Sequence, residues 1–270
     1  MDPKPSLLIS LVSLIFTTSL SAQTIPYGIN DTAAHRLHRE DAEIYYEVYG
    51  EGPPVLLLHG GFYGYIHEFA DYIDILSKHY RVIALATRGH GRAPIGSTPY
   101  TRRLLADDAA AVLKHTTNQP AIVIGFSCGA KTAYMLAAHY PDEVKKVVAI
   151  GAGPRVSESA INWAKNLQPT TVAVHKQWMP EPERWDDFVK NIKHLYIHNG
   201  GVSDQELQQI NRPVLLIAGD RDYFNPVSEF DRAHSIIKNS QLLVLPDCDH
   251  VGSMSKPIVL REFILPFIQK

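Results

Sequence analysis

The chain carries the stretch AIVIGFSCG at residues 121–129, in which a β-branched run leads into Gly-Phe-Ser-Cys-Gly. A helix-like segment, residues 130–140, follows at once. A G-x-S-x-G pattern between a strand and a helix predicts a sharp turn that exposes the Ser127 hydroxyl, with Gly125 and Gly129 leaving room for the tight backbone. Unpaired backbone N–H groups at the start of the helix can receive an oxyanion formed beside this serine. The stretch therefore predicts a nucleophilic serine.

Short apolar segments and segments with helical spacing alternate on both sides of this turn. Runs rich in apolar and β-branched residues predict strands at residues 43–49, 55–58, 81–86, 121–126, 147–150, 213–218 and 241–245. Apolar residues at helical spacing predict helices at residues 66–80, 101–115, 130–140, 228–238 and 257–268. Because continuous apolar strands separated by helices are typical of parallel sheets, we expect an α/β fold, with a mostly parallel sheet covered by helices on both faces.

The alternation is interrupted between residues 154 and 211. This stretch shows no convincing central strand, and it is rich in prolines and in aromatic residues, including all three tryptophans of the chain. An aromatic-rich insertion of this size between two sheet strands is typical of a helical cap over the strand ends. We therefore expect a core formed by residues 23–153 and 212–270, with a cap insertion at residues 154–211.

Composition narrows the possible partners. The 270 residues are 45% hydrophobic and 20% charged, which suits one sizeable globular core. The net charge is −2, without long basic or acidic runs. Because nucleic acids and anionic membranes select basic patches, we expect neither as a partner.

The first 22 residues have the layout of a signal peptide. Lys4 lies in a short polar start, residues 7–16 are apolar, and small residues lead to Ala22. This pattern predicts cleavage near Ser21 or Ala22 and export to a periplasm or to the extracellular medium. An uncleaved N-terminal anchor is the alternative. No later segment reaches the ~18 uninterrupted apolar residues of a membrane helix, so we expect no stable membrane association after cleavage.

Ser127 needs a base within hydrogen-bond reach and a carboxylate that orients the base. Two strings after it supply these groups: Gly-Asp-Arg-Asp at residues 219–222 and Asp-Cys-Asp-His at residues 247–250. Each string follows a predicted parallel strand, and open α/β sheets place their sites at the carboxyl ends of such strands. The order serine, acid, histidine also fits a G-x-S-x-G scaffold.

With these strings, with His-Gly-Gly at residues 59–61 and with the glycine-rich loop at residues 88–91, the chain resembles the α/β-hydrolase superfamily over nearly all of its length after the leader. The resemblance implies Ser127 as nucleophile, His250 as base and Asp222 as the acid. Asp220, the other aspartate of its string, is the alternative acid. No cofactor and no metal are implied.

The resemblance also implies an oxyanion hole made by the backbone N–H groups of Cys128 and Gly61, with Phe62 as a fallback for the second donor. Such donors are backbone groups, so side-chain identity says little about them. Phe62, Trp178 and Met179 are expected to contact substrate.

These residues predict a secreted serine hydrolase that cleaves a small carboxylic ester or lactone through an acyl-enzyme. An aminopeptidase similar to prolyl iminopeptidases is an alternative, with Glu181 and Glu183 as candidates to bind an α-ammonium group. Phe62 and Cys128 stand where those relatives usually have proline and tryptophan, which argues against this alternative. A non-hydrolytic lyase or binding protein on the same fold is a third possibility, because fold does not fix function.

Two further residue pairs have the spacing or position to suggest a metal site or a disulfide. His194 and His198 are four residues apart but lack an H-E-x-x-H pattern, so no metal site is expected. Cys128 and Cys248 lie close in sequence to the predicted nucleophile and base, which leaves a disulfide as an alternative. We expect two free thiols, because the residue after such a nucleophile commonly points into the fold.

Overall fold

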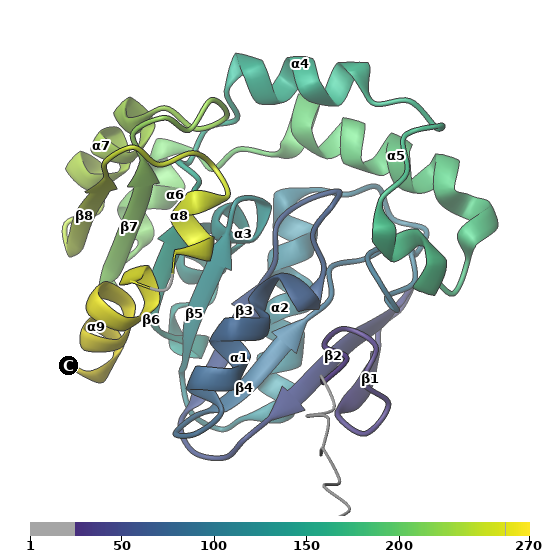
Figure 1. The fold of residues 1–270 in the computed structure, drawn as a ribbon, viewed down its shortest axis with the longest axis horizontal. Helices are drawn as coiled ribbons and strands as arrows, with labels where there is room; N and C mark the ends of the chain where they lie inside the picture. The colour runs from purple at the N-terminus through teal and green to yellow at the C-terminus, as the bar shows by residue number, and fades with distance from the viewer. Residues whose placement is uncertain (1–24, 257) are drawn as a thin grey trace, which may run out of the picture.

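The computed structural model describes residues 25–256 and 258–270, and the predicted signal peptide at residues 1–22 lies outside these ranges. In the described chain, eight strands form one sheet in the order β1-β2-β4-β3-β5-β6-β7-β8 (Figure 1). The strands are β1 (Ala34–His38), β2 (Glu43–Tyr49), β3 (Pro54–Leu58), β4 (Arg81–Leu85), β5 (Ala121–Phe126), β6 (Val144–Ile150), β7 (Val214–Gly219) and β8 (Ser240–Leu245). β1 pairs antiparallel with β2, β2 pairs antiparallel with β4, and every other pairing is parallel.

Helices cover both faces of this sheet (Figure 1). The α-helices are α1 (Ala70–Leu76), α2 (Arg102–Thr116), α3 (Cys128–His139), α4 (Glu158–Asn166), α5 (Trp185–His194), α6 (Asp204–Gln209), α7 (Val227–Ile236), α8 (Gly252–Ser255) and α9 (Leu265–Gln269). Residues from α2, α3, α6 and α7 share one buried cluster with the sheet, and residues from α1, α8 and α9 share another. The predicted α/β fold, with a mostly parallel sheet between two helical layers, is confirmed.

The alternating direction of side chains along each strand explains why helices pack on both faces of the sheet. On β3, Leu56 and Leu58 belong to the cluster under α2 and α3, whereas Val55 and Leu57 belong to the cluster under α1. Successive side chains of a strand point to opposite faces, so a continuous apolar run supplies both layers at once.

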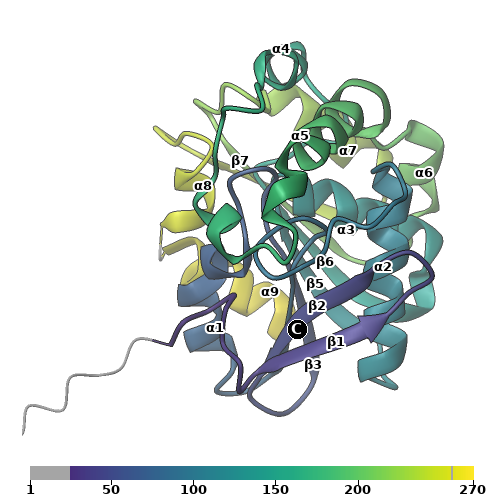
Figure 2. The same cartoon turned by 90° about the vertical axis from the view of Figure 1, so that its right-hand side faces the viewer.

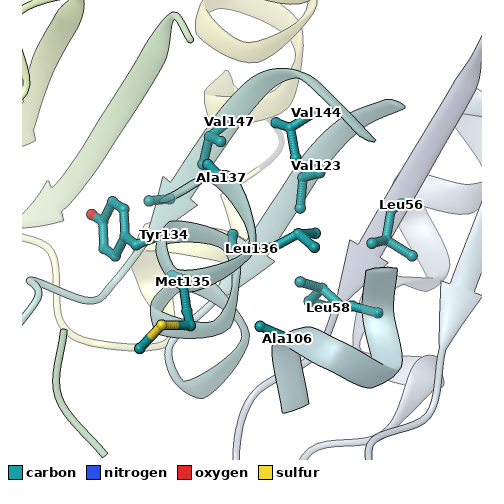
Figure 3. Packing of buried hydrophobic residues seen from close by; sticks show 14 of the residues in the cluster. Leu56, Leu58, Ala106, Val123, Tyr134, Met135, Leu136, Ala137, Val144 and Val147 are labelled. Carbon is teal, nitrogen blue, oxygen red and sulfur yellow. The ribbon is translucent and has the colours of Figure 1, made fainter. Parts of the chain in front are cut away.

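Helix α3 lies very close to the sheet because small residues face the strands. Figure 3 shows Leu136 and Ala137 packed toward Val123 and Val147 of β5 and β6. At the start of the helix, a Cβ on Gly129 would collide with the carbonyl oxygen of Leu58. The close approach fixes the first turn of α3 against the ends of β3 and β5.

The predicted elements match the core with local differences. β1 was not predicted, because its polar-rich sequence AHRLH lacks an apolar run and lies at the sheet edge. The helix predicted at residues 66–80 begins with the 3₁₀ turn Ile66–Phe69 and ends as α1 at Leu76. The C-terminal helix consists of the π turn Val259–Ile264 followed by α9.

The segment 154–211 contains helices and turns but no strand among its described residues. Figures 1 and 2 show α4 and α5 across the carboxyl ends of the parallel strands. Trp185 and Phe188 of α5 share a third buried cluster with Phe62 and Tyr100 of the core. The last helix of the segment, α6, packs against α3 instead. Among the described helices, none has both the length and the apolar character needed to cross a bilayer.

Candidate active site

Ser127 occupies a tight turn between β5 and α3. Its backbone has φ 51° and ψ −112°, a conformation that a non-glycine residue adopts only when its surroundings impose it. The Ser127 N–H donates to the carbonyl of Ile150 at 2.8 Å, and its own carbonyl accepts from Ala130 N at 3.1 Å. These bonds hold the half-buried serine at the carboxyl end of the sheet.

A line of two hydrogen bonds joins this serine to a histidine and an aspartate. The His250 Nε2 atom lies 3.0 Å from Ser127 Oγ, and His250 Nδ1 lies 2.7 Å from Asp222 Oδ2. A carboxylate only accepts, so Nδ1 carries the ring proton and Nε2 is left as the acceptor for the serine proton. The structure therefore brings together all three residues expected from the sequence.

The Asp222 carboxylate is held firmly in place. It is 6% exposed, and its second oxygen accepts from the backbone N–H groups of Phe224 and Asn225 at 2.8 and 2.9 Å. Asp220 behaves differently: it is exposed and accepts from the Cys248 N–H at 3.0 Å. Hydrogen bonds from the backbone N–H groups of Cys248 and Asp247 lower the pKa of Asp220. Only Asp222 contacts the histidine.

The glycine turn after β3 lies beside the serine. Gly61 and Cys128 both line the cavity that contains Ser127, and a Cβ added to Gly61 would come within 3.1 Å of the Cys128 Cβ. The neighbouring Gly60 N–H donates to a Glu68 carboxylate oxygen at 2.6 Å. Both residues expected for an oxyanion hole therefore lie on the wall of the cavity that contains Ser127.

The serine and the histidine open into a cavity of about 180 Å³. This volume lies below the ~300–1,000 Å³ of pockets for drug-sized ligands, so it fits a compact molecule. From the 154–211 segment, the cavity is lined by Val156, Ala160, Trp163 and Tyr196. Its core lining includes Glu68, Phe126, Lys131, Phe224, Asn225 and Val251.

Burial shifts the pKa values of ionisable groups in this cavity so that their neutral forms are favoured. It raises the pKa of Glu68 to about 7 and lowers the pKa of Lys131 to about 7. Burial also raises the pKa of Tyr196 well above its usual range, so this side chain is a neutral hydroxyl. The cavity therefore combines apolar walls with a few polar groups near the serine.

Three residues expected at the substrate lie elsewhere. Phe62 is fully buried in an aromatic cluster, 5.7 Å between ring centroids from Phe188, and Met179 is buried in the same cluster. Trp178 packs against Tyr65 with ring centroids 5.3 Å apart. None of the three lines the cavity, because packing between the core and the 154–211 segment takes up their apolar surface.

Sequence reasoning missed much of the cavity lining, including Glu68, Lys131, Trp163 and Tyr196. Lys131 carried a usable signal, because it lies about one turn into the helix that begins directly after Ser127. Glu68, Trp163 and Tyr196 reach the cavity through loop and segment geometry, which no local pattern encodes.

Cys128 and Cys248 are both buried free thiols in the structure. The rings of His194 and His198 lie 5.4 Å apart between centroids and are tilted by 50°. The described residues contain no group of three or more histidine, cysteine or acidic side chains arranged to hold a metal.

Comparison with known proteins places this geometry in a family. A sequence model of the α/β-hydrolase fold matches residues 53–181. A 2-(acetamidomethylene)succinate hydrolase from Mesorhizobium japonicum is 34% identical over 248 residues, which cover 81% of this chain and 89% of that enzyme. The chain belongs to the α/β-hydrolase family.

Two further comparisons show lower sequence identity to this chain. The 3-oxoadipate enol-lactonase 2 of Acinetobacter baylyi is 24% identical over 244 residues, covering 82% of this α/β hydrolase and 91% of the lactonase. Among solved structures, a serine hydrolase involved in carbazole degradation superimposes with a TM-score of 0.73 at 19% identity. That match covers 87% of this chain and 98% of the other, and it supports the shared fold.

Proposed function

We propose that this α/β hydrolase is an exported enzyme that cleaves a small carboxylic ester or lactone, with Ser127 as the nucleophile. The observation that carries the proposal is the hydrogen-bonded line from Asp222 through His250 to Ser127, at 2.7 and 3.0 Å, on the wall of a small cavity. A serine in hydrogen-bond reach of a base that is itself oriented by a carboxylate is the geometry of nucleophilic acyl transfer.

The reaction proceeds in two steps. Ser127 Oγ attacks the substrate carbonyl while His250 Nε2 takes its proton, and the Asp222 carboxylate stabilises the imidazolium. The backbone N–H groups of Cys128 and Gly61 receive the oxyanion. The imidazolium then protonates the leaving alkoxide, which departs as an alcohol or, from a lactone, as the hydroxyl end of the opened ring. Water, activated by the same histidine, releases the acid and restores Ser127.

An ester or lactone suits the cavity better than the amine substrate of an aminopeptidase. Glu181, the acid considered for an α-ammonium group, accepts from the Ile95 N–H at 3.1 Å and from Arg184 at 3.0 Å. The cavity itself contains Lys131, whose charge opposes a cationic substrate. A lactonase among the relatives supports the same class of reaction.

A substrate panel tests the proposed reaction. The purified protein is assayed on p-nitrophenyl esters of increasing acyl length, on simple lactones and on proline 4-nitroanilide, with Ser127→Ala as the matched inactive variant. We expect turnover of short esters or lactones and a loss of about 10⁴-fold or more in kcat for the alanine variant. Turnover of the anilide alone would favour the aminopeptidase, and turnover of none of these would favour a binding protein or lyase.

Export rests on the leader at residues 1–22, which lies outside the described residues. Expression of the full chain followed by intact-mass measurement of the exported fraction tests it. We expect a mature form that begins just after Ser21 or Ala22. Full-length protein confined to the cytoplasm would contradict export.

A further inference from the structure

Lys131 lies next to the nucleophile and faces the same cavity. It is in the second turn of α3, four residues after Ser127, and its backbone N–H donates to the Ser127 carbonyl at 3.3 Å. Its side chain is 6% exposed and lines the cavity together with Ser127, His250 and Asn225. A buried ammonium group is therefore built into the wall of the cavity that contains the reacting hydroxyl.

The partner of this ammonium group is neutral. In the described chain its one side-chain hydrogen bond goes to the amide oxygen of Asn225 at 3.0 Å, and it forms no ion pair there. An ammonium has three donors, so two remain for other acceptors. Burying a charge in this way is unfavourable unless an opposite charge joins it.

A second buried cation, Arg102, lies near Lys131. Arg102 is 2% exposed, and in the described chain it forms no ion pair: its guanidinium donates to the carbonyl of Cys128 at 2.8 Å and to Thr132 Oγ1 at 3.0 Å. The positive end of the α3 dipole points to the same place. Asp222 and Glu229 attract Lys131 from a distance, but Asp222 is already bound by His250 and two backbone N–H groups.

We propose that Lys131 binds a carboxylate group of the substrate, so that the enzyme prefers esters or lactones that carry a second, ionised acid. This inference rests on the proposed ester or lactone hydrolysis and names its substrate class. Because Ser127 and Lys131 line one cavity of about 180 Å³, the reacting carbonyl and the carboxylate belong to the same small molecule. Half-esters of short dicarboxylic acids and carboxylate-bearing lactones fit this description.

Pairing with the substrate carboxylate explains how Lys131 can bind an anion although its pKa is lowered. Burial, with a contribution from Arg102, lowers the pKa of Lys131 to about 7 in the empty cavity. A carboxylate placed beside the amine favours the protonated form and so raises the pKa again. Glu68, which lines the same cavity, has its pKa raised to about 7 by burial, so it opposes the substrate anion less than an ordinary carboxylate would.

A pair of matched substrates tests the inference. Hydrolysis of monomethyl glutarate is compared with hydrolysis of methyl pentanoate, which has a similar length but no charge. We expect wild-type kcat/KM to be about tenfold or more higher for the half-ester, with most of the difference in KM, because a hydrogen bond to a charged group contributes on this scale. In Lys131→Met, the ratio of the two kcat/KM values should fall toward one.

The matched control is Lys146→Met. Lys146 is another largely buried lysine, at 9% exposure, but its ammonium donates to the Phe267 carbonyl at 2.9 Å and it does not line the cavity. This variant should keep the wild-type ratio. A lysine that only supported the Asn225 loop would behave differently, because its loss would lower turnover of both esters equally.

An inhibition experiment on the wild-type enzyme needs no variant to fold. Butanoate and butanamide are compared as competitive inhibitors of methyl pentanoate hydrolysis, and butanoate should inhibit at about tenfold lower concentration. Equal rates on the two esters with equal inhibition, or an unchanged ratio in Lys131→Met, would overturn the carboxylate assignment while leaving ester hydrolysis intact. Hydrolysis of neither ester, together with no turnover of the lactones, would overturn both proposals.

Discussion

Asp222 and Asp220 are two residues apart, and only one of them reaches the histidine. Asp222 is buried and bonds to His250 Nδ1 at 2.7 Å, whereas Asp220 is exposed and bonds to a backbone N–H of the loop that carries His250. The Asp222 carboxylate orients the imidazole of His250 and stabilises its charged form. The roles of the two aspartates therefore differ in kind.

Substitution of each aspartate by asparagine separates these roles. Asp222→Asn should lower kcat by about 10⁴-fold, because the amide favours the wrong tautomer of His250 and leaves the imidazolium without a counter-charge. Asp220→Asn should cost far less, since the amide oxygen still accepts from the Cys248 N–H. Steady-state kinetics on a short ester measures both. A larger loss at Asp220 would assign the acid to that residue instead.

At this scale, the sequence predicted the three hydrogen-bonded residues but, apart from Gly61 and Cys128, not the cavity wall. Ser127, Asp222 and His250 follow sheet strands in an order that topology converts into proximity. Side-chain type alone indicates Trp178 and Met179, but packing between the core and the segment buries or displaces them. Trp163 and Tyr196 line the cavity instead, because the path of the segment determines which aromatic rings face the serine.

At the scale of the elements, the first turn of α3 depends on a glycine. A Cβ at Gly129 would collide with the carbonyl oxygens of Leu58 and His59, so α3 would have to move away from β3. That movement would also displace the N–H of Cys128, which begins the helix. The packing of one helix on one strand thus determines the geometry beside the serine.

Gly129→Ala should therefore lower the melting temperature by several degrees and reduce ester turnover, because overpacking of this kind costs about 1–3 kcal/mol or more. Gly201→Ala is the matched control, since the nearest atom to an added Cβ there is 3.7 Å away. It should leave both quantities nearly unchanged. Equal melting temperatures for the two variants would show that α3 tolerates displacement.

A cluster of three buried histidines joins the core to the 154–211 segment. The rings of His59 and His90 lie 4.9 Å apart and those of His90 and His175 lie 5.0 Å apart, and His175 Nε2 donates to the Phe62 carbonyl at 2.6 Å. Burial lowers the pKa of His59 and of His175 to about 4, and it lowers the pKa of His90 well below its usual range. The cluster is therefore neutral in the folded protein near pH 7.

Folding stability should fall as the pH is lowered through this range. Between the ordinary histidine pKa of 6.5 and about 4, the unfolded chain binds protons that the folded chain does not, so the free energy of unfolding decreases. His90→Asn, whose amide can replace the Nδ1 donor, should reduce the slope of this dependence by about 1 kcal/mol per pH unit. Denaturant unfolding at pH 7, 6 and 5 measures the slope. If the free energy of unfolding depends on pH with the same slope in the variant and the wild type, the three histidines are not neutral in the way inferred.

At the scale of the whole molecule, the cavity is shared between the core and the 154–211 segment. The core supplies the serine and the histidine, and the segment supplies apolar walls that include Trp163. The spacing of apolar residues predicted the layered core, because the pattern of each strand and helix lies within its own short stretch of sequence. The fit of the segment to the core depends on side-chain packing between distant residues, which such patterns do not describe.

Trp163→Ala should enlarge the cavity and shift the preference toward longer acyl chains. The indole packs against Tyr196 with ring centroids 5.2 Å apart and lines the cavity. The ratio of kcat/KM for hexanoate to that for acetate esters should rise about tenfold, the scale on which an apolar pocket discriminates by size. Trp178→Ala, in the same segment but away from the cavity, should leave the ratio unchanged. A shift only in the second variant would place the substrate on the other side of the segment.

Labelling with a fluorophosphonate shows whether a neighbouring base activates Ser127, because this reagent traps a serine that such a base has activated. The folded protein is treated with the reagent, digested and mapped by mass spectrometry. We expect one adduct, on Ser127, and a strongly reduced labelling rate in His250→Ala. An unlabelled protein, an adduct on another residue, or an unchanged rate in His250→Ala would contradict it.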